Sequence, residues 1–273
     1  MMRALWSAAS GMIAQQTNVD TIANNLANVN TTGYKTSTAE FKTLLYQTIQ
    51  SRTTTANGEN KPTPAQVGLG VRNSSITTHF KQGPTYASEK DFSFAIDGEG
   101  FFAVRGVDGE TYYTRCGDFQ MALGNNGTMM LCSSEGYPVL DTDDQPIIFP
   151  ADYIANKIEV TADGEFLYPD ETNNLQTLGV RIGVYQFANP AGLTNQSGTL
   201  FTESTASGVA VEETSDPQLK RSQVIQGYLE GSNVQVVDEM VNLITAQRAY
   251  EMNSKAIQAA DEMLGQANQL KRG

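Results

Sequence analysis

A chain of 273 residues that is 40% hydrophobic is long enough to bury a sizeable core, in one large domain or two small ones. Its 18 basic against 30 acidic residues give a net charge of −12, which argues against nucleic acid as a partner because such binders neutralise phosphates with clustered Lys and Arg. No segment reaches the roughly 20 apolar residues that cross a bilayer, and the N-terminus lacks the apolar core of a secretory signal, so we expect no membrane insertion and no cleaved signal peptide.

The first predicted element is an amphipathic helix over residues 5–29. Its apolar positions form two series with a spacing of seven, namely Leu5, Met12, Val19 and Leu26, and Ala8, Gln15, Ile22 and Val29. This is the seam of a coiled coil with one polar gap. Gly33 follows as the residue expected to end the helix.

Asparagine is unusually frequent at the end of this helix, at positions 24, 25, 28 and 30, although it is a mediocre helix former. Two interpretations are open. Asn28 and Asn30 could simply fray and cap the helix end. Alternatively, the carboxamides lie at an interface where neighbouring chains satisfy them, since an amide both donates and accepts. Asn24 and Asn25 are more than a turn inside the helix, which favours the interface.

Residues 34–80 predict an extended connector. A short apolar fragment, FKTLLYQTI, leads into SRTTTANGENKPTPAQVGLG, which is rich in Thr, Asn, Gly and Pro. Such composition is typical of extended chain with turns.

Residues 81–231 predict an all-β domain. Phe92, Phe94 and Ile96 alternate with small or polar neighbours, and short strand candidates are separated by Gly-based turns such as DGEG, VDGE and ADG. LGVRIGVYQF, residues 178–187, predicts one longer strand. Frequent turns of this kind indicate a barrel or a sandwich and argue against βαβ units.

A second helix is predicted from Ser232 almost to the end of the chain. SNVQ at 232–235 fits a capping box with Ser232 as the N-cap. The seam positions are Val236, Leu243, Tyr250, Ile257 and Leu264, and the companion positions include the small residues Ala246 and Ala260. We therefore expect an α+β fold in which 1–33 and 232–273 form an antiparallel coiled-coil-like domain.

Each helix carries more apolar surface than one partner helix covers. Trp6 and Ile13 flank the first seam, while Val237, Val241 and Ile244 flank the second. A monomer would leave this surface in water, which soluble monomers avoid. The chain is therefore expected to assemble with copies of itself or of a near relative.

No pattern in the sequence predicts catalysis, a cofactor or a metal. DTDDQP, residues 141–146, fails as a calcium loop because Pro146 stands where glycine is needed. The single histidine, His79, completes neither a zinc site nor a catalytic triad. Cys116 and Cys132 could form a disulfide only in an oxidising compartment; two small buried hydrophobic residues are the alternative.

Three stretches of the chain resemble the bacterial flagellar rod and hook axial protein family. SAASGMIAQQTNVDTIANNLANVNTTGYK (7–35) resembles the family's N-terminal signature, and GSNVQVVDEMVNLITAQRAYEMNSKAIQAADEML (231–264) resembles its C-terminal partner. AIDGEGFFAV (95–104) and YTRCGDF (113–119) are similar to its β domain. Within the family, residues 44–72 resemble the connector of the distal-rod subfamily; a related shorter rod subunit with a similar β domain is the alternative.

The resemblance implies a structural role in the basal body, within the cell envelope and periplasm, after export by the flagellar type III apparatus. Subunits would stack as a helical tube, with terminal helices inside, through heterologous contacts that do not close into a ring. The tube would transmit torque and form part of the export channel. The implied partners are the chain itself, proximal rod subunits, hook-side axial proteins, ring (bushing) proteins and the export apparatus.

The assembly interface is expected to use the two seams and the asparagine-rich helix end. Its predicted residues are Leu5, Met12, Val19, Ile22, Asn24, Asn25, Leu26, Asn28, Val29, Gly33, Tyr34, Lys35, Val236, Leu243, Ala246, Tyr250, Ile257, Ala260 and Leu264. Export to an oxidising space would also make a Cys116–Cys132 bridge possible.

Two hypotheses of other functional classes remain as alternatives. A peptidoglycan-binding β module needs an exposed aromatic platform or a carboxylate pair across a cleft, and the only tryptophan, Trp6, lies in the helical region. An adhesin-like or chaperone module should keep its binding when residues 1–33 are removed.

Overall fold

The structure, a computed structural model, describes residues 2–50, 65–124, 127–150, 153–170 and 174–270. The chain divides into two compact units. Unit 1 is Met1–Ala27, Ser37–Thr77 and Gln235–Gly273, and unit 2 is Asn28–Thr36 and Thr78–Val234. The predicted connector, 34–80, is therefore shared between the units. A helix at each end and a mostly β region between them confirm the predicted α+β class.

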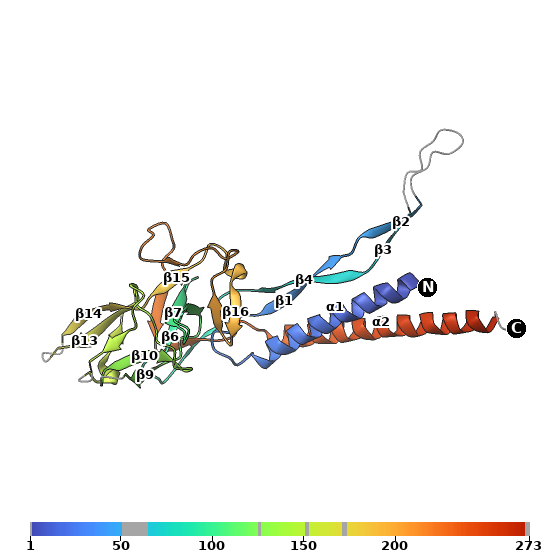
Figure 1. Cartoon of the computed structure of the whole chain (residues 1–273). Helices are drawn as coiled ribbons and strands as arrows, with labels where there is room; N and C mark the ends of the chain where they lie inside the picture. The colour runs from blue at the N-terminus through green and yellow to red at the C-terminus, as the bar shows by residue number, and fades with distance from the viewer. Residues whose placement is uncertain (1, 51–64, 125–126, 151–152, 171–173, 271–273) are drawn as a thin grey trace. The chain divides into compact units, whose positions relative to one another are not determined.

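Two long helices form most of unit 1, α1 (Met2–Ala27) and α2 (Val236–Leu270). Figure 1 shows them side by side and antiparallel, so that α1 begins near the end at which α2 terminates. Their contact is close because small residues lie in it: a Cβ on Gly11 would stand 2.9 Å from Nδ2 of Asn253. Among the described helices, none is both long and apolar enough to span a membrane.

The predicted capping box at Ser232 is wrong, because α2 begins four residues later. The first helical bond runs from Glu239 N to the carbonyl of Gln235 (3.0 Å), and Ser232 Oγ accepts from Val234 N (3.3 Å) instead. The preceding segment is held extended, since Gly231 N donates to Pro84 O (2.8 Å). Tertiary hydrogen bonds therefore override the local capping signal.

The described part of the connector in unit 1 consists of two strand pairs. They are β1 (Ser37–Thr43) with β4 (Val71–Thr78), and β2 (Tyr46–Gln50) with β3 (Ala65–Gly68). The ribbon is attached to α1 by Val71 N donating to Ser10 Oγ (3.3 Å) and by Asn73 Nδ2 donating to Thr17 Oγ1 (2.6 Å). A two-stranded ribbon is marginally stable alone, so these bonds to α1 support it.

Among the described residues, unit 2 contains the remaining strands and two short 3-10 helices. In chain order they are β5 (Thr85–Ala87), β6 (Phe94–Asp97), β7 (Phe101–Arg105), β8 (Thr111–Thr114), β9 (Phe119–Leu123), β10 (Met129–Ser133), β11 (Ile148–Phe149), η1 (Ala155–Lys157), β12 (Glu159–Val160), β13 (Glu165–Pro169), β14 (Leu175–Arg181), β15 (Val184–Gln186), η2 (Pro190–Gly192), β16 (Thr194–Ser197), β17 (Leu200–Thr202), β18 (Val211–Glu212), β19 (Gln223–Gln226) and β20 (Tyr228–Glu230).

The largest sheet of unit 2 has six strands in the order β16-β17-β8-β7-β15-β18. Smaller sheets are β11-β10-β9, β12-β13-β14, β19-β6 and β20-β5. β7 is buried on both faces: Phe102 and Val104 pack into one core cluster, while Phe101 and Ala103 pack into a second. Successive side chains of a strand point to opposite faces, which explains why one strand contributes to both clusters.

The single long strand predicted over 178–187 is wrong, since the chain breaks between β14 and β15 at Ile182 and Gly183. Ile182 pairs with Asp141 in an isolated bridge. A Cβ on Gly183 would stand 2.9 Å from the carbonyl oxygen of Asp141, so the glycine permits this close backbone approach.

Candidate assembly site

Most of the apolar residues predicted for assembly lie in unit 1, where α1 and α2 also contact each other. Ile22, Ala246 and Ala260 are buried. The half-buried positions are Leu5, Met12, Val19, Leu26, Leu243, Ile257 and Leu264. Val236 and Tyr250 remain exposed. The small companion positions of α2 are therefore the ones its partner helix covers, and much of the larger series is left accessible.

The outer faces of both helices carry exposed apolar side chains. On α1, Trp6 is 73% and Ile13 66% exposed. On α2 the exposed apolar side chains are Val236, Val237, Met240, Val241, Ile244, Tyr250, Met252, Met263 and Leu270. Pairing of the two helices within one chain thus leaves an apolar surface of the kind that marks an interaction site.

Asn25 is a clamp within unit 1. It is 1% exposed; its Nδ2 donates to the carbonyl of Ser37 (2.8 Å), and its Oδ1 accepts from the amide of the same residue (3.0 Å). Both ends of the carboxamide therefore bind the first residue of β1. Its own chain therefore supplies partners for this carboxamide, and the predicted role of Asn25 in assembly stays a prediction. Asn24, by contrast, lies on the exposed side of α1.

The chain turns sharply between Asn28 and Gly33. Asn28 O accepts from Thr31 N (3.2 Å), and its Oδ1 accepts from Thr31 Oγ1 (3.1 Å), so both bonds stabilise the turn that follows α1. Gly33 has φ of +71°, and a Cβ there would stand 2.5 Å from Cys116 N. Glycine is thus required both by its backbone conformation and by the close approach. Val29 is half-buried in the same turn.

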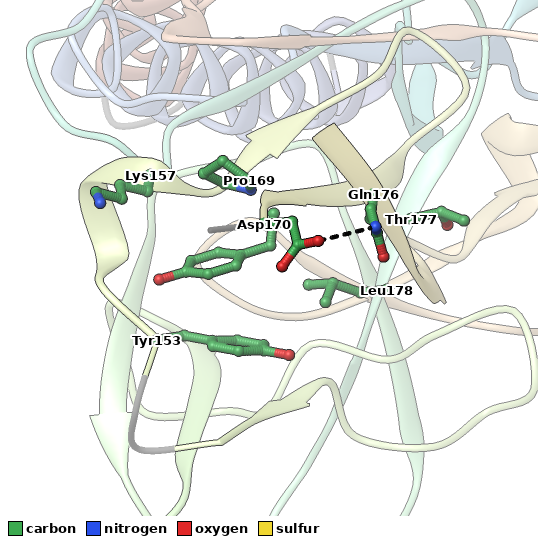
Figure 2. A pocket seen from close by; sticks show the side chains of 8 residues that line it. Tyr153, Lys157, Pro169, Asp170, Gln176, Thr177 and Leu178 are labelled. Carbon is green, nitrogen blue, oxygen red and sulfur yellow. Dashed lines mark hydrogen bonds between the residues drawn. The ribbon is translucent and has the colours of Figure 1, made fainter. Parts of the chain in front are cut away.

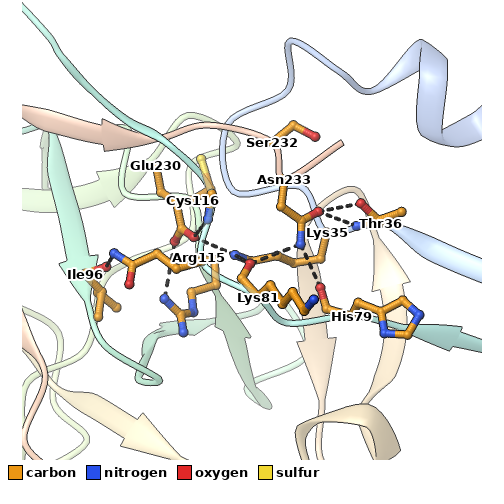
Figure 3. Close-up of polar contacts among 12 residues, drawn as sticks. Lys35, Thr36, His79, Lys81, Ile96, Arg115, Cys116, Glu230, Ser232 and Asn233 are labelled. Carbon is orange, nitrogen blue, oxygen red and sulfur yellow. Dashed lines mark hydrogen bonds and ion pairs between the residues drawn. The ribbon is translucent and has the colours of Figure 1, made fainter. Parts of the chain in front are cut away.

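A buried ion-pair junction holds the beginning and end of unit 2 together (Figure 3). Lys35 Nζ lies 2.5 Å from Glu230 Oε1, and both side chains are 0% exposed. Arg115 Nη1 lies 3.3 Å from the other carboxylate oxygen. The amide of Gly83 also donates to Glu230 Oε1 (2.8 Å). One carboxylate thus serves two cations and one backbone donor.

The two cations of this junction have further partners. Lys35 Nζ donates to the carbonyl of Lys81 (2.8 Å), and Arg115 Nη2 donates to that of Gly98 (2.8 Å). The Arg115 guanidinium also lies 5.1 Å from the ring centroid of Phe101. Burial lowers the pKa of Lys35, and the Glu230 carboxylate offsets part of that effect. Burial likewise lowers the pKa of Arg115.

Asn233 continues the junction with neutral hydrogen bonds. Its Oδ1 accepts from Thr36 N (2.8 Å) and Thr36 Oγ1 (2.6 Å), while its Nδ2 donates to the carbonyls of His79 (2.9 Å) and Lys81 (3.0 Å). His79 N in turn donates to Thr36 O (2.8 Å). The junction therefore ties together three chain segments that enter or leave unit 2.

Lys35, Gly33 and Tyr34 were predicted as interface residues, and the structure places all three inside unit 2 as buried residues. No pattern in the sequence predicted Glu230, Arg115 or Asn233 as functional residues. The sequence does contain a signal for two of them, because each is a charged residue within a strand pattern. Arg115 lies in YTRCGDF, and Glu230 lies in YLEGSN. A charge in such a position is rarely buried unless it is paired.

The possible Cys116–Cys132 disulfide is not formed, since both are free thiols. Cys116 Sγ lies 3.2 Å from Thr32 Oγ1 beside the Gly33 turn. Cys132 is buried in β10, in register with Gln120 of β9. The two thiols thus have separate surroundings, and burial raises the pKa of Cys132.

No group of three potential metal ligands occurs among the described residues. In the segment 141–146, Asp141 Oδ1 instead accepts from Thr142 N (2.6 Å) and Arg181 N (3.1 Å). The acidic turn therefore serves backbone hydrogen bonding.

Three family models match separate parts of the chain. Residues 5–35 match the flagella basal body rod protein model, residues 95–168 match the D1 domain of the flagellar hook protein FlgE/F/G, and residues 225–270 match the C-terminal region of the flagellar basal body rod FlgEFG protein. The matches cover α1 with its asparagine-rich end, much of unit 2, and α2 with Glu230. They define the class as an axial protein of the bacterial flagellum.

Full-length relatives narrow this class. The flagellar basal-body rod protein FlgG of Borreliella burgdorferi is 44% identical, with 100% of both chains aligned. FlgG of Agrobacterium fabrum is 43% identical over 96% of this chain and 97% of its own, and FlgG of Buchnera aphidicola subsp. Acyrthosiphon pisum is 38% identical over 99% and 100%. The chain belongs to the FlgG family of flagellar basal-body rod proteins.

Proposed function

We propose that the chain is a structural subunit of the distal rod that polymerises through the exposed faces of its terminal helices. The observation that carries this proposal is the apolar outer surface of unit 1, typified by Trp6, Ile13 and Val237. The helices already pair within the chain, so a further apolar surface of this extent needs a second copy or a close relative to cover it.

The ribbon of unit 1 supports the same proposal. Leu45 is 85%, Tyr46 60% and Ile49 58% exposed. Strands that expose apolar side chains and unpaired edges tend to associate with another chain. In the polymer such a ribbon would lie against a neighbouring subunit and stiffen the contact between the two.

The polymer would be a helical tube that transmits torque and forms part of the export channel. Contacts of this kind join different surfaces of successive copies, so the subunits continue along a helical filament instead of closing into a ring. Its partners would be copies of itself, proximal rod subunits, hook-side axial proteins and ring proteins. Its place would be the basal body within the periplasm, reached through the flagellar export apparatus without a cleaved signal peptide.

The proposed role requires packing and no catalysis. The buried charges of the junction are paired with one another: the Glu230 carboxylate forms ion pairs with Lys35 and Arg115 and accepts a hydrogen bond from the amide of Gly83. An arrangement of this kind fixes chain segments in place and presents no reacting group to a substrate. We therefore assign the chain a mechanical role and no enzymatic one.

Electron microscopy of basal bodies from a strain lacking this chain tests the proposal. The expected outcome is a rod without its distal part and without a hook, restored by the wild-type chain. Hooks of normal appearance in the deletion strain would overturn the assignment. The related shorter rod subunit, the alternative from sequence, would give a rod interrupted at a more proximal point.

A further inference from the structure

A pocket of about 710 Å³ lies in unit 2 beside the sheet β12-β13-β14. Its volume falls within the range of roughly 300–1,000 Å³ that is typical of sites for small ligands. The residues that matter to its chemistry are Tyr153, Lys157, Tyr168, Asp170, Gln176 and Leu178. Neither the junction nor the apolar faces of unit 1 include any of them.

Two tyrosines give the pocket an aromatic wall. The rings of Tyr153 and Tyr168 are stacked, with centroids 4.3 Å apart and an interplanar angle of 19°. Both rings pack, together with Leu178, against the larger core cluster of unit 2. The hydroxyl of Tyr168 also accepts from Ile154 N (3.4 Å). The wall is therefore supported from behind while it remains partly accessible.

Polar groups stand beside this wall because of strand register. Tyr168 of β13 is directly opposite Gln176 of β14, and opposed residues of an antiparallel pair share a face. Asp170 lies two residues further on, and Gln176 Nε2 donates to its Oδ2 (3.3 Å). Figure 2 shows this pair facing each other near Leu178, with Lys157 and Tyr153 at other sides of the pocket.

The combination of an aromatic wall with a carboxylate and an amide suits one class of ligand. A sugar ring has an apolar face of C–H groups, which packs on aromatic rings, and hydroxyls that both donate and accept. A carboxylate accepts, whereas an amide does both. Phosphate ligands fit poorly because Lys157 is the single cation among the described lining residues. We propose that this pocket binds a saccharide.

The pocket is suited to binding and not to cleavage of the sugar. Glycoside hydrolysis uses two carboxyl groups on either side of the scissile bond. Asp170 is the single carboxylate among the described residues that line the pocket. The aromatic platform that a glycan-binding β module needs is thus supplied by tyrosines, and the tryptophan of α1 has no part in it.

Titration of the full-length chain with chitotetraose and with cellotetraose, followed by NMR, tests this site. We expect shift changes that concentrate at Tyr153, Tyr168 and Gln176. Tyr153→Ala should weaken the affinity about tenfold, since an aromatic contact is removed, whereas Tyr153→Phe keeps the ring and should stay within about twofold of wild type. Gln176→Ala, at an exposed position, provides a second variant with little risk to folding.

Tyr46→Ala serves as the matched control, because this tyrosine is exposed on β2 of unit 1. It should leave saccharide affinity unchanged. Absence of shift changes with both oligosaccharides would overturn the proposal. So would saccharide binding that Tyr153→Ala and Gln176→Ala both leave at the wild-type affinity. These outcomes do not depend on polymerisation, so the saccharide site can fail while the rod assignment stands.

Discussion

Lys35 and Glu230 are 195 residues apart in the sequence, yet their charged atoms lie 2.5 Å apart and both side chains are fully buried. The pair joins the segment that follows α1 to the segment that precedes α2, and both segments belong to unit 2. A rod subunit must carry force from its terminal helices to the rest of the chain. The junction is the place where the two chain segments from those helices are bonded to the β strands.

Glu230→Gln should destabilise unit 2 strongly. The substitution removes the shared counter-charge of Lys35 and Arg115, and leaving buried charges without a partner costs roughly 3–5 kcal/mol. Urea unfolding followed by near-UV circular dichroism measures this change. Lys90→Met is the control, because the Lys90–Asp118 pair has side chains 51% and 21% exposed and should contribute only about 0–1 kcal/mol. Equal losses in the free energy of unfolding from the two substitutions would show that the buried junction stabilises unit 2 no more than an exposed ion pair does.

Gly33→Ala should also destabilise unit 2. The residue has φ of +71°, and its new Cβ would stand 2.5 Å from Cys116 N and 2.7 Å from Arg115 C. Strained backbone of this kind costs about 1–3 kcal/mol, and displacement of the Arg115 backbone would disturb the junction as well. Thermal unfolding gives the measurement.

Gly109→Ala is the matched control for this experiment. Gly109 has φ of +80° but nothing within 4 Å of the added Cβ. It should show the conformational penalty alone, so its loss of stability should be smaller than that of Gly33→Ala. A loss as large at Gly109 would mean that the close approach to Cys116 does not matter.

The sequence predicts those elements of the fold that have a repeat of apolar residues along one segment, or a turn residue within it. The spacing of Leu5, Met12 and Val19 gave the first helix, and Gly33 gave its turn. The Lys35–Glu230 pair leaves no such trace, because its two residues are brought together only by the completed fold. Asn25 is similar: its sequence position indicated a special role, but its partner, the backbone of Ser37, offers no side-chain signal.

Asn25→Ala should loosen the start of β1 without unfolding unit 2. It removes two hydrogen bonds to the backbone of Ser37, and each buried group left unsatisfied costs about 1–3 kcal/mol. Hydrogen exchange should become faster at the Ser37 amide, while the amides of β7 in unit 2 keep their protection. Unchanged exchange at Ser37 would show that the clamp does not hold the strand.

Two buried tyrosines should make the protein sensitive to alkaline pH. Tyr113 donates to Glu203 and Tyr185 donates to Asp144, both at 2.8 Å. Burial, aided by these carboxylates, raises the pKa of each tyrosine. The folded state thus keeps protons that the unfolded chain releases near pH 10. Stability from these groups is complete below about pH 10 and is lost as pH rises beyond it.

The free energy of unfolding, measured between pH 8 and 11, checks this dependence. The double variant Tyr113→Phe, Tyr185→Phe should show a flatter decline above pH 10 than the wild type, since it has two fewer groups with a raised pKa. Tyr46→Phe replaces an exposed tyrosine and should follow the wild-type curve. If the double variant declines as steeply as the wild type, other groups govern alkaline unfolding.

Ile13→Ser and Val237→Ser should impair assembly of the rod while leaving the folding of the single chain unaffected. Their side chains are 66% and 73% exposed in the single chain, so each substitution should change the free energy of unfolding by less than about 0.5 kcal/mol. In the polymer the same positions would be buried, and the loss of apolar contact should shorten rods and reduce swimming in complemented deletion cells. Val107→Ser, at a position 90% exposed in a turn of unit 2, should keep both rods and swimming intact. Wild-type swimming with both helix variants would mean that subunits meet through another surface. Loss of an apolar side chain from a buried contact weakens that contact, so positions that tolerate serine cannot lie in it.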